Sequence, residues 1–210
     1  MKKGILVVVS GFSGAGKGTV MKALLQKYDN YALSISATTR NPRDGEVHGR
    51  EHFFKTVEVF EALIEQDDFI EYAKYVSNYY GTPKSYVLEQ LDKGKDVILE
   101  IEIQGALKVK EKMPDTQLIF LTPPSAEELR NRLIGRGTET MDVVAKRLAT
   151  ANEEAKVMEL YDHILVNDVL DECVDNLHNL IQSEKCATGR NQEFISNIRE
   201  ELKVFLKGDN

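Results

Sequence analysis

The hydrophobic pattern of the chain alternates between short apolar runs and longer stretches with polar positions. Three runs, at residues 5–9, 96–102 and 118–121, are apolar enough to be strands buried on both faces, and residues 163–167 predict a last strand. The stretches at 19–28, 105–113, 126–135, 141 onward and 170–183 predict helices. Strands that alternate with helices in this way predict an α/β fold with a parallel sheet.

Between the first helix and residue 95 the elements are shorter. Residues 32–36, 53–54 and 69–76 predict strands, and residues 57–64 and 84–91 predict helices. Residues 78–83 contain Asn, Gly and Pro and predict a turn.

The first buried strand leads directly into a glycine-rich loop. Gly11 and Gly16 are five residues apart and Lys17 follows, which is the spacing of a phosphate-binding loop. Glycines allow backbone N–H groups to converge on phosphate oxygens, and a helix N-terminus favours negative charge. Lys17 supplies a mobile positive charge for the β- and γ-phosphates. The loop therefore predicts ATP binding through Gly11, Phe12, Ser13, Gly14, Ala15, Gly16, Lys17, Gly18 and Thr19.

One position of this loop departs from the usual pattern. Gly18 follows the lysine where such loops have Ser or Thr, and the hydroxyl of Thr19 comes one residue later. The hydroxyl that usually contacts Mg²⁺ is therefore displaced. We expect no dedicated protein metal site, with Mg²⁺ carried mainly by ATP oxygens and water near Thr19.

Composition limits the class of protein. The chain has 210 residues, 42% of them hydrophobic and 29% charged, as in an ordinary globular domain. The net charge of −7 argues against a protein that coats nucleic acid, so anionic substrates must meet local arginines. Cys173 and Cys186 lack metal-ligand spacing and are expected to be reduced thiols of a cytoplasmic protein. No run approaches the ~20 apolar residues of a membrane span, and no membrane partner is expected.

Two groups of arginines have the arrangement of phosphate ligands. Arg40 and Arg43 lie three residues apart in a loop rich in Gly and Pro, where forked hydrogen bonds could hold one phosphate. Arg136 lies between two glycines that separate helices carrying Arg132 and Arg147, which suggests a mobile, positively charged lid. A solvated connector and a helical hairpin with solvated charges are the alternatives.

Carboxylates mark the carboxyl end of the second buried strand. Glu100 and Glu102 would share one face of a strand over residues 96–102. In a doubly wound sheet that end faces the ligand crevice. Because the strand is too apolar for an exposed edge, we interpret these acids as part of a site.

These stretches resemble the guanylate kinase family over roughly residues 4–185. The matching segments occur in the family's order, at residues 10–19, 36–49, 69–73, 78–82, 98–105, 123–125, 132–138 and 166–168. The resemblance implies a P-loop nucleoside monophosphate kinase fold, with a parallel sheet core and helices on both faces. It also implies a domain at 1–185, with a GMP-binding insertion at about 37–95 and an arginine-bearing lid at about 126–157. Residues 186–210 would form a C-terminal helical tail.

The resemblance further implies Mg²⁺-dependent transfer of the ATP γ-phosphoryl group to GMP, giving ADP and GDP in purine nucleotide metabolism. It implies contacts to the GMP phosphate from Arg40, Arg43 and Tyr80, and to guanine from Ser36, Glu71, Thr82 and Glu102. Arg132, Arg136 and Arg147 would join Lys17 and Arg40 at the transferred phosphoryl group, and Asn167 would lie near the ATP base. At the position of a phosphate-binding tyrosine of the family this chain has His52, which is expected to donate a hydrogen bond to the GMP phosphate.

The chemistry of the base supports this interpretation. Guanine presents two N–H donors on one edge, which ionised carboxylates accept, whereas adenine lacks both, so Glu71 and Glu102 would select guanine. A GMP phosphate oxygen is already anionic, so no general base is required. A kinase for another nucleoside monophosphate and a catalytically weak guanylate-kinase-like interaction module remain alternatives, although the phosphate loop and arginines argue against the latter. A monomer or weak homo-oligomer is expected.

Overall fold

A computed structural model of the protein describes residues 3–75, 77–135 and 140–206. A five-stranded sheet with strand order β2-β7-β1-β8-β9 forms its centre, and every strand pair in it is parallel. The strands are β1 (Leu6–Gly11), β2 (Tyr31–Leu33), β7 (Asp96–Glu100), β8 (Gln117–Thr122) and β9 (His163–Val166). The predicted α/β fold with a parallel sheet is therefore confirmed.

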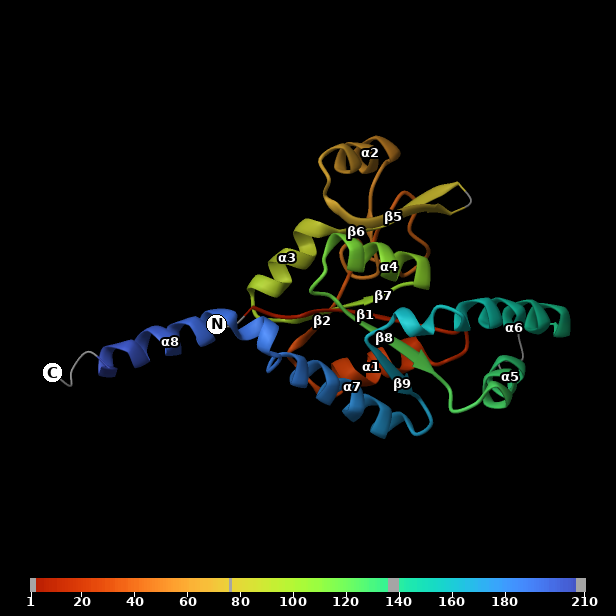
Figure 1. The fold of residues 1–210 in the computed structure, drawn as a ribbon. Coiled ribbons are helices and arrows are strands. Elements are labelled where there is room, and N and C mark those ends of the chain that lie inside the picture. The colour runs from red at the N-terminus through yellow and green to blue at the C-terminus, as the bar shows by residue number, and fades with distance from the viewer. Residues whose placement is uncertain (1–2, 76, 136–139, 207–210) are drawn as a thin grey trace.

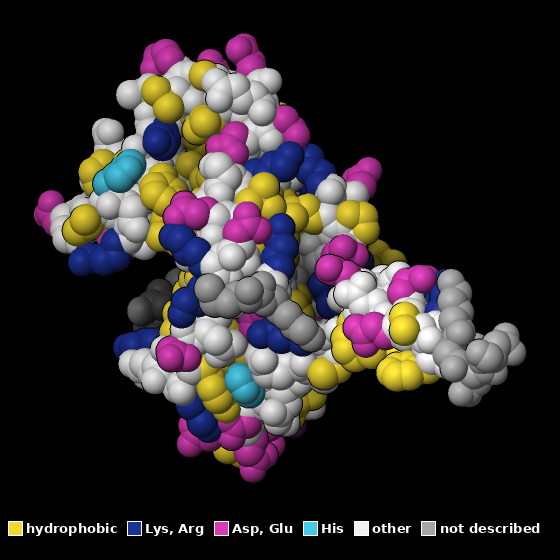
Figure 2. Space-filling view, turned by 90° about the vertical axis from the view of Figure 1, so that its left-hand side faces the viewer, with side chains coloured by type: hydrophobic (Ala, Val, Ile, Leu, Met, Phe, Trp, Pro, Cys, Tyr) yellow, Lys and Arg dark blue, Asp and Glu magenta, His cyan; other side chains and the backbone are white. Residues whose placement is uncertain are grey.

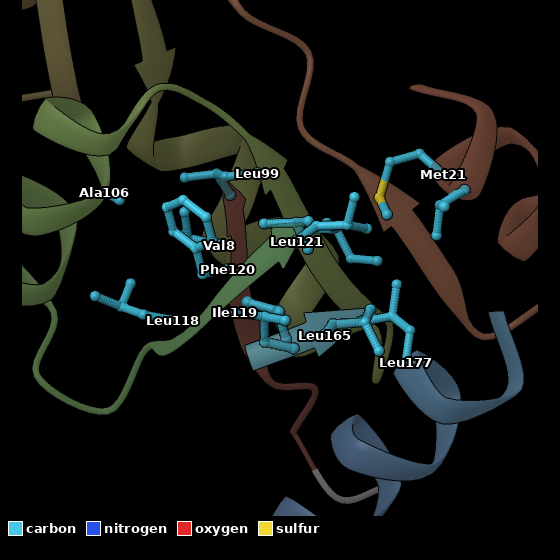
Figure 3. Packing of buried hydrophobic residues seen from close by; sticks show 14 of the residues in the cluster. Val8, Met21, Leu99, Ala106, Leu118, Ile119, Phe120, Leu121, Leu165 and Leu177 are labelled. Atoms are coloured by element: carbon cyan, nitrogen blue, oxygen red, sulfur yellow. The ribbon is translucent and has the colours of Figure 1, made fainter. Parts of the chain in front are cut away.

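Helices cover both faces of this sheet (Figure 1). One face carries α1 (Lys17–Lys27) and α7 (Leu170–Glu184), and the other carries α3 (Lys84–Asp92) and α4 (Ile103–Lys112). All six residues of β1 are buried, which explains its continuous apolar run. Figure 3 shows Ala106 of α4 on one side of the strands, with Met21 of α1 and Leu177 of α7 on the other. The main hydrophobic core thus has two layers, one on each face.

A second sheet lies above the first in Figure 1 and has its own small core. It contains β3 (Ala37–Thr38), β4 (Phe53–Phe54), β5 (Phe69–Tyr75) and β6 (Asn78–Pro83) in the order β4-β3-β6-β5. Helix α2 (Val57–Glu65) packs on it, capped by the Thr56 hydroxyl, which accepts a hydrogen bond from the Val59 N–H. Phe60 of α2 stacks on Phe69 and Tyr79, at ring-centre distances of 4.3 and 5.1 Å.

Three sequence expectations are wrong in detail. Residues 78–83 form strand β6 rather than a turn, because their aromatic residues pair with β5 on one side and β3 on the other. Of the stretch 32–36, only Ala32 and Leu33 lie in a strand, β2, and residues 34–36 connect it to β3 of the other sheet, which begins at Ala37. Strand β7 ends at Glu100, and Glu102 is the N-cap of α4, so these acids do not share a strand face.

The connection from β8 to β9 contains two helices, α5 (Ala126–Gly135) and α6 (Met141–Ala155), followed by a 3₁₀ turn at Met158–Leu160. Arg136, the arginine expected between two glycines, lies outside the described residues. Helices α5 and α6 pack on each other beyond the carboxyl ends of the strands (Figure 1). This places the arginines of both helices beside the phosphate loop.

After α7, a 3₁₀ turn at Thr188–Asn191 leads into α8 (Gln192–Leu206), which extends away from the sheets (Figure 1). Several apolar side chains of this helix are exposed, among them Phe194, Leu202 and Phe205. On the side of the molecule seen in Figure 2, Lys and Arg side chains are interspersed with Asp and Glu. Within the described part of the chain, no helix combines the length and the apolar character needed to cross a membrane.

Candidate active site

The loop between β1 and α1 has a backbone that requires glycine. Gly14 and Gly16 adopt φ values of 98° and 95°, which are left-handed conformations that other residues rarely occupy. A Cβ atom at Gly16 would also lie 2.5 Å from Nδ2 of Asn167. The loop and the first turn of α1 line a cavity of about 380 Å³ together with Glu100. Backbone N–H groups at a helix N-terminus make such a cavity suited to phosphate.

Lys17, at the start of α1, folds back over this loop. Its Nζ donates hydrogen bonds to the carbonyl oxygens of Gly11, at 2.7 Å, and Phe12, at 3.3 Å. Lys17, Gly18 and Thr19 all line the cavity, which is the space that the sequence assigns to ATP phosphates.

Glu100 belongs to this cavity although it is absent from the residues expected to bind ATP. Strand β7 pairs directly with β1, and Glu100 stands opposite Val9 just before the phosphate loop. The side chain is exposed, yet neighbouring protein atoms displace enough water to raise the pKa of the carboxyl group, an effect that the positive charge of Lys17 opposes. The sequence signal for Glu100 was its position as an acid at the carboxyl end of a predicted strand, here the strand that pairs with β1.

Three side chains from distant parts of the sequence reach the phosphate loop. Arg147 of α6 donates a hydrogen bond to Oγ of Ser13. Arg132 of α5 donates from Nη1 to the carbonyl oxygen of Ala15 at 3.4 Å, while its Nε donates to Glu128 at 2.7 Å. Asn167, directly after β9, donates from Nδ2 to the same carbonyl at 2.8 Å. Two expected lid arginines and Asn167 therefore meet at one loop.

A second cluster of polar residues lies on the smaller sheet. Arg40 follows β3, and its Nη1 and Nη2 each donate to one carboxylate oxygen of Glu46 at 2.9 Å. Glu46 and, to a smaller extent, the Tyr80 side chain of β6 raise the pKa of the Arg40 guanidinium, so Tyr80 lies close to Arg40. The Arg43 N–H donates to Glu46 at 2.7 Å, and the Arg43 side chain is exposed. Arg40 and Tyr80 are thus brought together, and Glu46 is a partner that sequence reasoning did not identify.

The expected guanine ligands divide into a close pair and two separate residues. Glu71 of β5 stands opposite Thr82 of β6 and accepts a hydrogen bond from its hydroxyl at 2.8 Å. Burial raises the pKa of the Glu71 carboxyl group, and the hydrogen bond from Thr82 opposes this. Ser36 lies just before β3, with its carbonyl oxygen bonded to the Phe53 N–H. Glu102 is exposed at the start of α4, the helix whose Gly105 faces the Glu71 carboxylate.

His52 lies beside Tyr80, with ring centres 6.3 Å apart, and beside Phe54 at 5.8 Å. Its Nδ1 is buried without a hydrogen-bond partner among the described residues. His52 and His48 are connected by an isolated β-bridge. The histidine is therefore next to Tyr80 in the cluster around Arg40.

The phosphate loop follows a buried strand of a parallel sheet, arginines from two later helices are bonded to it, and a second cluster of polar residues lies on the smaller sheet. This is the arrangement of a P-loop kinase. The model of the family "Guanylate kinase" matches residues 3–184. The chain belongs to the guanylate kinase family.

Its relatives match over nearly their whole length. The chain is 52% identical over 200 residues to a guanylate kinase of Caldanaerobacter subterraneus subsp. tengcongensis, covering 95% of this chain and 97% of that protein. It is 47% identical over 203 residues to a guanylate kinase of Lactococcus lactis subsp. lactis, covering 97% and 99%. The crystal structure of guanylate kinase from Anaplasma phagocytophilum is similar with a TM-score of 0.68 and 34% identity over 90% of each chain.

Proposed function

We propose that the protein transfers the γ-phosphoryl group of ATP to GMP, giving ADP and GDP, in an Mg²⁺-dependent reaction. Guanylate kinase activity follows from the family and from relatives about 50% identical over most of the chain. The choice of base rests on Glu71, a half-buried carboxylate that accepts a hydrogen bond from the Thr82 hydroxyl on the smaller sheet. An ionised carboxylate in that position accepts N–H donors of guanine, and adenine offers none on the same edge.

The ATP site is the phosphate loop, residues 11–19, with Asn167 supporting the loop at Ala15. Loop N–H groups and the N-terminus of α1 bind the phosphates, and Lys17 turns from the loop carbonyls towards the β- and γ-phosphates. Arg132 and Arg147, together with Arg136, meet the transferred group from a lid at about 126–157. Their charge stabilises the phosphoryl oxygens as the bond to ADP breaks.

The GMP site is the insertion at about 37–95. The GMP phosphate binds Arg40, Arg43, Tyr80 and His52, and the base binds Ser36, Glu71, Thr82 and Glu102. The attacking phosphate oxygen is anionic, so these residues orient it and no side chain has to remove a proton. Binding in the insertion and in the phosphate loop places the two phosphates in line between the sheets.

The residues at the phosphate loop suit an Mg²⁺ ion that is bound to ATP and enters the site with it. Among the described residues no group of three or more His, Cys, Asp or Glu side chains is placed to hold a metal. Mg²⁺ typically keeps several waters and takes one or two carboxylates plus substrate phosphates, and Glu100 with Thr19 would supply the protein side of such a site. When bound, the ion neutralises phosphate charge. We further propose a cytoplasmic protein that is a monomer or weak homo-oligomer.

The test is a coupled assay of ADP production with GMP, dGMP, AMP and UMP as acceptors. GMP is expected to exceed AMP by roughly 10⁴-fold in kcat/KM, the scale of discrimination that buried polar groups provide. Comparable rates with AMP or UMP would identify a kinase for another monophosphate. Absence of ADP production with every acceptor, in a protein that still binds GMP, would identify a non-catalytic module.

A further inference from the structure

Glu46 lies against Arg40 in the loop between β3 and β4. Both carboxylate oxygens are used, Oε2 with Nη1 and Oε1 with Nη2 of Arg40, each at 2.9 Å. Oε2 also accepts the backbone N–H of Arg43 at 2.7 Å. The Arg40 and Glu46 side chains expose only 16% and 18% of their surface, which is unusually little for an ion pair in a surface loop.

The carboxylate of Glu46 is ionised at neutral pH. The hydrogen bonds from Arg40 and from the Arg43 backbone lower its pKa to about 2. A fixed anion therefore stands next to the arginine that the proposed function assigns to the GMP phosphate. It could compete with that phosphate for Arg40, or it could orient Arg40 to receive it.

The pattern of donors on Arg40 favours orientation. A guanidinium has five N–H donors. Nη1 donates to the Asn41 carbonyl oxygen and to Glu46, and Nη2 donates once to Glu46. The contacts to Asn41 and Glu46 use three of these donors, which leaves one on Nε and one on Nη2 for the neighbouring Tyr80 and a phosphate, so Arg40 can bind a phosphate without releasing Glu46. A two-point contact also fixes the plane of the guanidinium.

We infer that Glu46 is a positioning residue, which holds the Arg40 guanidinium and the Arg43 backbone in the arrangement that receives the 5′-phosphate of the nucleoside monophosphate. The inference rests on the proposed function, since it needs Arg40 as a phosphate ligand. An arginine that is already ordered loses less rotamer freedom when substrate binds. Removal of the Glu46 charge is thus expected to weaken binding of GMP and leave binding of ATP unchanged.

The same loop contains a matched control. Glu51 also accepts a backbone N–H, from Val47 at 2.7 Å, and an arginine N–H, from Nε of Arg50 at 2.6 Å. These contacts likewise lower the pKa of the Glu51 carboxyl group. Arg50 is, however, largely exposed and has no proposed substrate contact. Glu51→Gln therefore removes a similar local ion pair without disturbing Arg40.

The experiment compares steady-state kinetics of wild type, Glu46→Gln, Glu51→Gln, Arg40→Met and the double variant Glu46→Gln/Arg40→Met. Glu46→Gln is expected to raise KM for GMP about tenfold, the size of one charge-assisted contact, with KM for ATP unchanged. Glu51→Gln is expected to leave both KM values unchanged. The double variant is expected to match Arg40→Met alone, because without Arg40 there is nothing for Glu46 to position.

Glu46→Asp is a second variant that keeps the test possible if Glu46→Gln does not fold. It keeps the charge but is one methylene too short for the two-point contact, and we expect KM for GMP to rise about threefold. A wild-type KM for GMP in either variant overturns the inference, as does a lower KM, which would show that Glu46 competes with substrate. Multiplicative effects in the double variant also overturn it. Arg40→Met with an unchanged KM for GMP would instead contradict the proposed phosphate site itself.

Discussion

The two proposed phosphate sites of this protein are built in opposite ways. At the end of β1 the site is made of backbone N–H groups, glycines in left-handed conformations and a helix N-terminus, supported by a strand whose six residues are all buried. On the smaller sheet the site is made of side chains, and Arg40 is fixed by its ion pair with Glu46. The buried hydrophobic core beneath this second site contains just Ala37, Phe60 and Phe69 among the described residues. The fold itself fixes the first site, whereas a few pairwise contacts fix the second.

The largest effect is expected at the backbone-built site. Lys17→Ala removes the mobile positive charge at the transferred phosphoryl group, and kcat should fall by roughly 10³-fold, the upper range for loss of one transition-state contact. Circular dichroism should show an unchanged fold. Lys22→Ala, an exposed lysine on the same helix, is the control and should keep wild-type kcat. Near-normal turnover of a folded Lys17→Ala protein would remove Lys17 from the mechanism.

The second prediction separates the two regions by stability. Phe60 is fully buried and stacked between Phe69 and Tyr79, so Phe60→Ala should cost about 3–5 kcal/mol within the small core. GMP binding, measured by calorimetry, should then be lost while ATP binding persists. Phe194→Ala, at an exposed position of α8, should change neither. Equal loss of both ligands would show that the insertion and the main sheet unfold as one cooperative unit.

The third prediction concerns base selection by the smaller sheet. Glu71→Gln keeps the shape of the side chain but replaces an acceptor oxygen with an amide donor. The value of kcat/KM for GMP should fall by roughly 10²-fold, as for other mismatched buried polar groups. The residual activity with AMP should not fall comparably. Equal losses with both acceptors would mean that Glu71 supports the sheet through Thr82 rather than contacting guanine.

The contrast between these two sites also explains which parts of the structure could be predicted from the sequence. The phosphate loop is local: Gly11, Gly16 and Lys17 lie within seven residues, and the buried strand before them marks their position. Strand β6 could not be found locally, because Gly81 and Pro83 are typical of turns and its pairing with β3 bridges about forty residues. Gly81 is required there because a Cβ would lie 2.8 Å from side-chain atoms of Phe69 and Tyr72.

Two carboxylates show the limit of local patterns at the site. The strand pattern indicated that Glu100 belongs to a site, but not that this site is the phosphate loop. Glu100 lines the phosphate cavity because β7 pairs with β1, a relation between residues about ninety positions apart. Glu46 is three residues from Arg43 but has no sequence signature, since a glutamate in a charged loop is usually solvated. The arginine spacing indicated Arg40 and the family resemblance supplied Glu71 and Tyr80, whereas the contacts that hold these side chains are apparent in the structure alone.

The fourth prediction uses the raised pKa of Glu71. Guanine requires the ionised carboxylate, so kcat/KM for GMP should begin to fall at a higher pH than the ~4.3 of an ordinary glutamate. Because the folded state binds this proton more tightly than the unfolded state, Glu71 should also make the protein less stable as pH rises from the ordinary value through the raised one. In Glu71→Gln both dependences should be absent. The titration of GMP itself contributes equally to the pH profiles of wild type and variant. If the two profiles are parallel, Glu71 is not the cause of the pH dependence.

The smallest effect is expected at His52, where this chain departs from its family. The ring lies beside Tyr80, and its buried Nδ1 has no partner among the described residues. His52→Tyr places a phenol hydroxyl at the position where the family has a phosphate-binding tyrosine. KM for GMP should fall about threefold, because the hydroxyl is expected to donate a stronger hydrogen bond to the phosphate than the imidazole N–H that it replaces. His48→Tyr changes the exposed partner of the same β-bridge and should leave KM for GMP unchanged. A higher KM in His52→Tyr would mean that the contact of the histidine to the phosphate is the stronger one and that tyrosine cannot reproduce it. An unchanged KM would make His52 a packing residue, and Arg40, Arg43 and Tyr80 would then account for the side-chain contacts to the phosphate.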